Sequence, residues 1–388
     1  FNNPYQYFFE QMHMDDAIYA DESIYEYPMQ QGGGNDGRPY SFGRPSSGGS
    51  KAAYPCKSYG QGRINPAYFY GVFDPNDMRR DVSITMTGSN GKGVEKLIPF
   101  VPNSKAEGGG LTLNKWDENR QANPWVAAQR KSGINGPYMR MSEVYLGYAE
   151  VCAALGDVVT GKQYLKTVRE RSFPQGLANT DAFIASFGND LVRAIIEERG
   201  FEYAGEGDRR WTLIRSGYLP EDIKRIKDMT KAMMDGLATK GYYEFENGNI
   251  ISAYIWTKLV DAKTIYGHRL TAQCPTDKVN DPVLYPGWRG QKDNWEEMGL
   301  NYGSSTPATN LAIKGLFEIV SEEEAASLES QGYAKVNWGI DLVDYRDEYD
   351  KYLFWDYDYV SAPIYLWPFT PNVMAAGGFT NGYGFKQE

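Results

Sequence analysis

The residues that could carry chemistry gather in one stretch, residues 193–215, where arginines and carboxylates are interspersed. The stretch contains five arginines and five acids: Arg193, Arg199, Arg209, Arg210, Arg215, Glu197, Glu198, Glu202, Glu206 and Asp208. Paired carboxylates can serve as general acid and base in glycoside hydrolysis. An acid catalyst needs a raised pKa, however, whereas nearby guanidinium groups favour the ionised carboxylate. The residues therefore favour a structural ion network, and no catalytic residue is assigned.

Other reactive groups are sparse. The sequence contains only three cysteines and two histidines: Cys56, Cys152, Cys274, His13 and His268. Their wide spacing matches neither a zinc site nor a dense disulfide framework, and two imidazoles disfavour a histidine-based metal site. The glycine-rich segment at 88–93 does not match a phosphate-binding loop, which needs Ser or Thr after its lysine, because Lys92 is followed by Gly93. A hairpin turn is therefore expected there. No metal or cofactor is predicted.

Composition narrows the class of ligand. The 40 Lys and Arg residues are outnumbered by 50 Asp and Glu residues, and a net charge of −10 disfavours binding to nucleic acid. No window approaches the roughly 18 consecutive apolar residues that a membrane-spanning helix needs. The 30 Tyr, 17 Phe and 9 Trp residues are an excess of aromatics, dominated by amphipathic tyrosine. This excess predicts a wet, aromatic-rich surface.

A segment rich in glycine, serine and proline, residues 29–62, is the candidate ligand-facing loop. It follows a predicted strand in ESIYEYPM, and aromatic residues are interleaved with its small residues: Tyr40, Phe42, Tyr54 and Tyr59. A flexible linker does not need aromatic side chains, whereas recognition often uses loops that present them on a rigid scaffold. A disordered surface loop without a ligand is the alternative interpretation.

Helical spacing begins in the middle of the chain. A helix is predicted from Tyr138 to Leu155, and a short connection to a second helix in GKQYLKTVRERS indicates an antiparallel pair. The predicted buried stripe of the first helix is Met141, Val144, Tyr145, Tyr148, Cys152 and Leu155. A third helix begins after Asn189 or Asp190, either of which is a good N-cap, and a short fourth helix ends at Gly217.

Later segments alternate helix and loop. Ser321 and Glu324 form a capping box that opens one helix, and the segment before it, back toward Ala308, is also predicted to be helical. Residues 68–135 are expected to form short strands and turns.

Four stretches share their pattern with one known family. The first two are PYMRMSEVYLGYAE, with an Arg before Glu-Val-Tyr-Leu, and YLKTVRERSF, with Val-Arg-x-Arg. The third, IIEERGFEYAGEGDRRWTLIRSG, contains Glu-Arg, a later Glu, then Glu-Gly and x-Arg, with Thr212 where the family has Asp. The fourth is YLWPFT followed by TNGY. In order and content these stretches resemble the SusD/RagB family, the nutrient-binding outer-membrane lipoproteins of Bacteroidetes.

The resemblance implies a mainly α, SusD-like fold, in which tetratricopeptide-like helix pairs carry a loop-rich, irregular lobe with short strands. It divides the chain into three parts packed as one unit. These parts are a ligand-facing lobe at residues 1–135, a helical scaffold at 136–220 and a mixed helix and loop part at 221–388. The family's signal peptide, lipidated cysteine and first helices are expected to lie outside this chain.

For function, the resemblance implies a cell-surface binding protein rather than an enzyme. Such a protein captures an oligosaccharide and delivers it to a SusC-like TonB-dependent transporter in the outer membrane. The binding protein itself is attached to the membrane only through a lipid anchor. The alternatives are a RagB-type lid that binds peptide and a glycoside hydrolase. The sequence shows no local signature for the two carboxylates that a hydrolase needs across a cleft.

The resemblance also suggests where the ligand binds, because the family often uses the segment that corresponds to residues 29–62. The predicted contacts are four stacking platforms, three polar partners and two further tryptophans: Tyr40, Phe42, Tyr54, Tyr59, Asn35, Asp36, Arg63, Trp288 and Trp295.

Overall fold

The computed structural model describes residues 5, 8–9, 22–30, 43, 63–89, 95–98, 100, 110–116, 133–261, 309–347, 365, 369–378 and 380. Over these residues the fold is mainly α, as predicted, with short strands in small sheets. The helices are α3 (Pro66–Gly71), α4 (Arg79–Ser83), α5 (Met141–Ala154), α6 (Val158–Glu170), α7 (Thr180–Ala185), α8 (Leu191–Glu202), α9 (Asp208–Ser216), α10 (Leu219–Lys240), α12 (Glu322–Ser330), α13 (Gly339–Asp344) and α15 (Pro371–Gly377).

The strands pair only in antiparallel fashion within the described part of the chain. They are β1 (Ser23–Tyr27), β2 (Ile84–Thr85), β3 (Thr87–Ser89), β4 (Glu95–Leu97), β5 (Thr112–Leu113), β6 (Gly136–Arg140), β7 (Tyr242–Glu244), β8 (Ile250–Ser252), β9 (Tyr254–Asp261), β10 (Thr309–Lys314) and β11 (Ala334–Asn337). The pairs are β1–β6, β2–β5, β3–β4 and β7–β8, and β9 lies between β10 and β11. The β3–β4 pair confirms the predicted hairpin.

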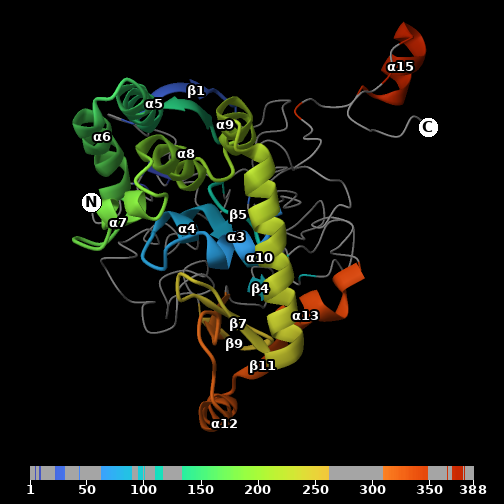
Figure 1. Ribbon diagram of the computed structural model, residues 1–388. Coiled ribbons are helices and arrows are strands. Elements are labelled where there is room, and N and C mark those ends of the chain that lie inside the picture. Colours follow the sequence, from blue (N-terminus) through green and yellow to red (C-terminus); the bar gives the residue numbers. More distant parts are fainter. Residues whose placement is uncertain are drawn as a thin grey trace.

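The elements form two regions joined by one long helix. Figure 1 shows α5 to α9 together in the upper part, with β1 running beside them, while β7, β9 and β11 lie at the lower end with α12 at the tip. Helix α10 runs between the two regions and packs against α3, α9, α13 and β7. This helix therefore fixes the helical region relative to the strands.

Two apolar cores hold these regions. The first lies between α5, α6, α7 and α8 and includes Leu146, Leu165, Ile184, Leu191 and Ile195. The second lies between α3, α10 and the strands and includes Phe69, Tyr70, Met233, Ile255 and Trp338. The second core also takes residues from each of the three predicted parts of the chain. Burying each of these large side chains contributes about 1.5–3 kcal/mol to folding.

The helix predicted from Tyr138 begins three residues later, because residues 136–140 form β6 and pair with β1. Its predicted buried stripe was also largely wrong. The buried face consists of Ser142, Leu146, Ala149 and Cys152. From the predicted stripe, Val144, Tyr148 and Leu155 are 45, 50 and 82% exposed. Small residues occupy the buried face because α6 and α8 pack closely there, which apolar spacing alone does not reveal.

The other helical predictions had mixed outcomes. Helices α6, α8 and α9 are confirmed: Asp190 caps α8 by accepting a hydrogen bond from the backbone N–H of Arg193, and α9 ends at Gly217 with φ 80°. The capping box of Ser321 and Glu324 is confirmed at α12. The helix expected back toward Ala308 is wrong, because residues 309–314 form β10 and pair with β9, about fifty residues earlier in the chain.

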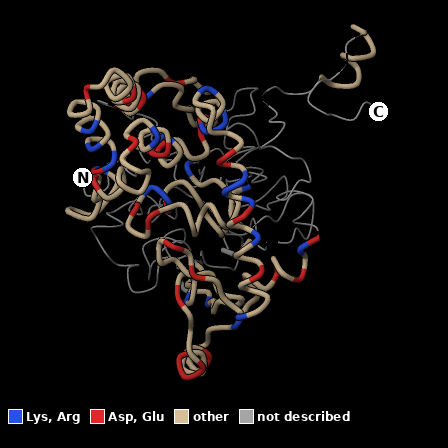
Figure 2. Tube along the Cα trace, viewed as in Figure 1, with Lys and Arg blue, Asp and Glu red and all other residues tan. Residues whose placement is uncertain are grey.

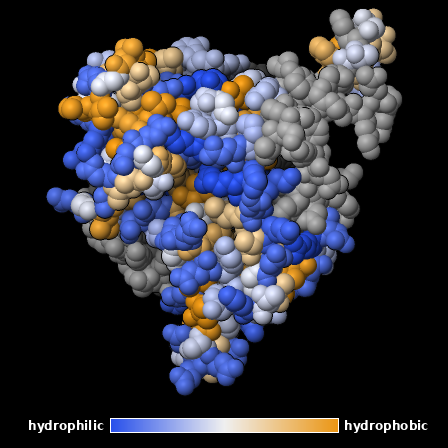
Figure 3. Space-filling model, viewed as in Figure 1, coloured by the Kyte–Doolittle hydropathy of each residue, from blue (hydrophilic) through white to orange (hydrophobic). Residues whose placement is uncertain are grey.

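The surface of the structure is uneven in character. Exposed apolar side chains on α5, on α6 and in the turn between them include Val151, Leu155, Val158 and Val159. Figure 3 shows a hydrophobic area at its upper left, where these helices lie in Figure 1. Acidic residues cluster on α12 at the lower tip in Figure 2. No described helix is both long and apolar enough to cross a membrane.

We expect Gly161→Val to destabilise the fold, because a side chain at this position of α6 would meet the backbone of α5. A Cβ there would lie 3.0 Å from the carbonyl oxygen of Ala149 and 3.2 Å from the backbone nitrogen of Ala153. Backbone atoms cannot rotate aside, so the helices must separate. The free energy of unfolding, measured by urea denaturation, should fall by about 1–3 kcal/mol.

Gly147→Ala is the matched control, because a Cβ at this helical position meets no atom within 4 Å. Alanine is the better helix former, so the control should gain up to about 1 kcal/mol. A Gly161→Val protein as stable as the wild type would contradict the close packing of the pair.

Candidate functional site

The structure describes one of the nine residues predicted to contact the ligand. Eight of them lie outside the described residues: Asn35, Asp36, Tyr40, Phe42, Tyr54, Tyr59, Trp288 and Trp295. Arg63 is described and exposed, and its backbone forms an isolated antiparallel bridge with Thr112. Arg63 therefore lies on the surface where the chain enters α3, and the ligand contacts of the loop stay a prediction.

The beginning of the predicted loop, at Met29, is held by the side chain of Asn135, the last residue of the predicted lobe 1–135. Strand β1 leads directly into residues 29–62. The Asn135 Oδ1 atom accepts a hydrogen bond from the Met29 N–H at 2.9 Å, and Asn135 Nδ2 donates to Glu26 Oε2 at 2.9 Å. Since Asn135 immediately precedes β6, the loop leaves the body at a fixed point beside the β1–β6 pair.

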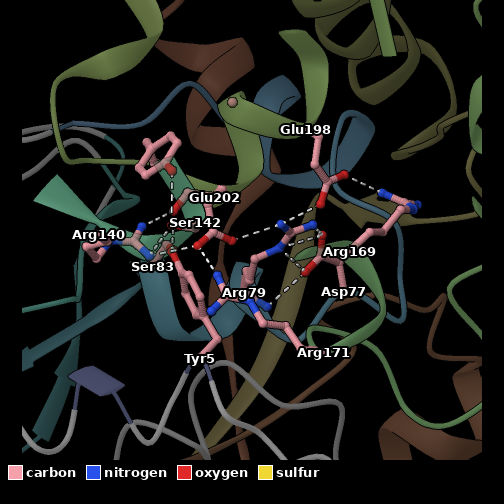
Figure 4. Close-up of polar contacts among 12 residues, drawn as sticks. Tyr5, Asp77, Arg79, Ser83, Arg140, Ser142, Arg169, Arg171, Glu198 and Glu202 are labelled. Atoms are coloured by element: carbon pink, nitrogen blue, oxygen red, sulfur yellow. Dashed lines mark hydrogen bonds and ion pairs between the residues drawn. The ribbon is translucent and has the colours of Figure 1, made fainter. Parts of the chain in front are cut away.

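Below this strand pair lies a buried ion network built on one face of α8. Glu198 and Glu202 are four residues apart on α8, a spacing that brings carboxylates to the same side of a helix, and Glu206 follows in the turn between α8 and α9. Their cationic partners come from segments far away in the sequence. Figure 4 shows Arg79 of α4, Arg140 of β6, and Arg169 and Arg171 from the end of α6 converging on Glu198 and Glu202.

Glu202 is the centre of the network and has no exposed surface. Its carboxylate accepts from Arg140 Nη1 at 2.7 Å and from Arg79 Nη1 at 3.2 Å, and it also pairs with Arg171. Burial by itself would raise the pKa of Glu202, but the guanidinium groups of Arg171, Arg140 and Arg79 hold it well below the ordinary value. Glu202 is therefore ionised at neutral pH.

Glu206 continues the network toward the surface. Its carboxylate accepts from Arg140 Nη2 at 2.8 Å, from Arg140 Nε at 3.0 Å and from Lys115 Nζ at 2.6 Å. Burial opposes the negative charge, but Arg140 and Lys115 lower the pKa of Glu206 overall. Burial also lowers the pKa of Lys115 to about 8, against the opposing effect of Glu206.

A second network lies on another face of α8. Glu197 pairs with Arg193, Arg209 and Arg225, while Asp222 of α10 also holds Arg209 and Arg225. The adjacent residues Glu197 and Glu198 thus point to different partners, as their helical positions predict.

Arg199 joins α8 to α5 and α9. Its Nη2 atom donates to Glu143 Oε1 at 2.9 Å and to Asp208 Oδ1 at 2.5 Å. Thr212 donates to Asp208 Oδ2 at 2.8 Å and accepts from Arg199 Nε at 3.3 Å. Although Thr212 departs from the pattern of the third motif, it still makes polar contacts within this cluster.

These contacts confirm the structural interpretation of the charged stretch. The predicted network is real, but most partners of Glu198, Glu202 and Glu206 lie outside residues 193–215. A general acid must hold a proton near neutral pH, whereas Glu202 and Glu206 are kept ionised by their cationic partners. Neither carboxylate is suited to acid catalysis. In the described part, no three acidic, histidine or cysteine residues are arranged to hold a metal ion.

A pocket lies beside the Glu202 network, where β6, α5, α8 and α9 meet. It has a volume of about 190 Å³ and is lined by Pro137, Tyr138, Arg140, Glu143, Tyr203, Glu206, Gly207 and Asp208. Tyr138 is 70% exposed at its rim, and the Tyr138 ring meets the Tyr25 ring edge to face with centroids 5.7 Å apart. Tyr25 and Tyr27 are also exposed. The pocket thus has a charged inner wall and an aromatic rim.

Sequence reasoning missed this rim and most of the network's cations. One signal for the network was present, because the carboxylates at 198 and 202, one turn apart on a helix with a buried face, require cationic partners. The rim gave only a weak signal. Tyr25 and Tyr27 alternate with Glu26 along a short strand, but the contact of Tyr25 with Tyr138 became evident only through the pairing of β1 with β6.

Comparison with known proteins agrees with the motifs. The model of the SusD family matches residues 16–369, which is most of the sequence. The chain belongs to the SusD family. A SusD-like protein of Formosa agariphila is 28% identical over 160 residues, which make up 41% of this chain and 26% of that protein.

Solved structures also match. A SusD homolog of Bacteroides thetaiotaomicron is 19% identical with a TM-score of 0.39, and covers 59% of this chain and 47% of its own. The surface glycan-binding protein A of the same organism, in complex with laminarihexaose, is 18% identical with a TM-score of 0.37, and covers 55% of this chain and 46% of its own. The chain spans about a quarter of the first relative and under half of each of these two structures.

We expect Glu202→Gln to destabilise the SusD-like fold strongly, because it removes the charge that compensates Arg79, Arg140 and Arg171 in a buried position. The free energy of unfolding at pH 7 should fall by about 3–5 kcal/mol. The pKa of Glu202 is lower in the folded protein than its ordinary value of 4.5. Its contribution to stability is therefore complete above about pH 4.5 and is lost as the pH falls further.

Denaturant titrations from pH 3 to pH 7 would measure both effects. The variant should lose stability less steeply than the wild type below pH 4.5. Glu150→Gln serves as control, since Glu150 pairs with Arg215 at the surface and its loss should cost at most about 1 kcal/mol. Equal stabilities of the Glu202 and Glu150 variants would contradict the central role of Glu202.

Proposed function

We propose that this protein is a cell-surface binding protein that captures an oligosaccharide and delivers it to a SusC-like TonB-dependent transporter of the outer membrane. Membership of the SusD family over residues 16–369 carries the proposal. SusD-like proteins are binding proteins, and the role implied by the family is nutrient capture at the outer face of the cell. A lipid anchor outside this chain would hold the protein there.

The chemistry of the described surface supports a saccharide as the ligand. Sugar rings have apolar C–H faces that pack on aromatic rings, and their hydroxyl groups need acceptors and donors at the edges of those rings. Exposed tyrosines beside carboxylates supply both, and Tyr25 and Tyr27 lie immediately before the predicted loop. The acidic balance of the chain also fits a neutral ligand better than a polyanion.

The state of two carboxylates in the charged cluster supports binding without turnover. Hydrolysis of a glycosidic bond needs one protonated and one ionised carboxyl across the bond. In the described charged cluster, Glu202 and Glu206 are both held ionised by arginines and a lysine, so they supply no proton donor.

We expect the purified chain to bind a soluble oligosaccharide and to leave it intact. Titration calorimetry against neutral oligosaccharides would report binding, and chromatography of the same samples after incubation would show whether sugars are released. Binding with an unchanged ligand supports capture. Released sugars would overturn the binding role, and selective binding of peptides from a parallel peptide panel would favour the RagB-type alternative.

We also expect the native protein to copurify with a TonB-dependent transporter from outer membranes solubilised in mild detergent. Affinity purification followed by mass spectrometry would test this, with a sample from cells that lack the protein as control. Recovery of the protein without any transporter would remove support for delivery while leaving capture intact.

A further inference from the structure

We propose that the pocket between β6, α5, α8 and α9 is a binding subsite for one neutral sugar ring, with Tyr138 as its stacking platform. The proposal rests on the proposed function, and it adds a site that is made entirely of described residues. Its residues are different from the aromatic residues predicted in the loop.

The aromatic part of the site is exposed and supported. Tyr138 lies at the pocket rim with 70% of its surface exposed. The edge of one ring meets the face of the other in the Tyr25–Tyr138 pair, with centroids 5.7 Å apart, and this contact favours one orientation of the Tyr138 ring. A ring that is both exposed and oriented can stack on a ligand with little loss of entropy.

The polar wall is fixed before any ligand arrives. Arg140 is 2% exposed, and its guanidinium is held by Glu22, Glu202 and Glu206. Glu206 therefore has a fixed position in the wall, which limits the reorganisation that binding requires.

The charges in the wall select a neutral ligand. Arg199 already compensates Glu143 and Asp208, while Arg140 and Lys115 compensate Glu206. A cationic ligand would have to compete with these ion pairs, and an anion would meet three carboxylates. Carboxylate oxygens can nevertheless accept further hydrogen bonds from hydroxyl groups. Among the described residues, Glu143 Oε2 has no hydrogen-bond partner, and the Glu143 side chain is 41% exposed.

The size and the donors of the pocket fit one ring of a longer chain. Its volume of about 190 Å³ is below the roughly 300–1,000 Å³ of clefts that enclose a whole drug-sized ligand. Gly207 lines the pocket and precedes α9, which has no side-chain cap, and the guanidinium of Arg140 lies in the wall with the carboxylates of Glu143 and Glu206. Sugar hydroxyls, which both donate and accept, match this mixture.

The subsite can be tested with Tyr138→Ala, because an exposed side chain can be removed without disturbing the core. The matched control is Tyr148→Ala, which removes a half-exposed tyrosine from α5 that does not line the pocket. The probe is the oligosaccharide that the wild-type chain retains most strongly on an array of neutral, acidic and amino-sugar glycans, and its affinity is then measured by calorimetry.

We expect Tyr138→Ala to weaken binding about five- to tenfold, which corresponds to roughly 1–1.4 kcal/mol, while Tyr148→Ala binds as the wild type does. Tyr25→Ala should produce a smaller loss. The affinity of the wild type should stay unchanged between 50 and 500 mM NaCl, because a neutral ligand adds no ion pair.

The outcomes separate the subsite from the proposed function. Glycan binding that is unchanged in Tyr138→Ala overturns the subsite but leaves capture standing. Binding that weakens steeply with salt overturns the choice of a neutral ring. A wild-type chain that retains no glycan on the array overturns both.

Discussion

The buried carboxylate of Glu202 is the interaction on which the arrangement of the helical region depends. Arginines from α4, β6 and the end of α6 meet on this one side chain. A charge taken out of water is tolerated only when its partners are in place, since removal of one partner leaves the others uncompensated. The carboxylate therefore requires a single relative placement of three segments that lie far apart in the sequence. Apolar packing between α5, α6 and α8 could tolerate small shifts more easily.

The buried ion network also reaches the wall of the pocket, through Arg140. Arg140 contributes one face to the buried ions and another to the pocket wall, so the rigidity of the interior extends to the surface. The tyrosines at the rim have no such constraint except their contact with each other. A fixed polar wall beneath an exposed aromatic rim suits recognition of a ligand. The same arginines that make the wall rigid keep Glu202 and Glu206 ionised, and so keep these two from acting as acid catalysts.

Sequence patterns succeeded where the interaction was local. The caps of α8 and α12 and the glycine that ends α9 involve residues within a few positions of one another, and each was predicted correctly. Patterns failed where a distant segment decided the outcome. Residues 309–314 became β10 because β9 supplies their hydrogen bonds, and Gly136–Arg140 became β6 because β1 does the same. The buried face of α5 was misjudged since close packing selected Ser142 and Ala149 over larger apolar residues.

The sequence by itself determined the family, the mainly α class and the need to compensate the carboxylates of α8. The family and the mainly α class follow from the resemblance of four stretches to the family, and the need for compensation follows from residue types and short spacings within one segment. Only the tertiary structure decided which cations compensate these carboxylates, because Arg79 and Arg140 reach Glu202 across more than sixty residues of intervening chain. It also brought Tyr138 against Tyr25 at the rim of a pocket, since that contact depends on the pairing of two strands over a hundred residues apart. Long-range contacts of this kind leave no regular period in a single sequence.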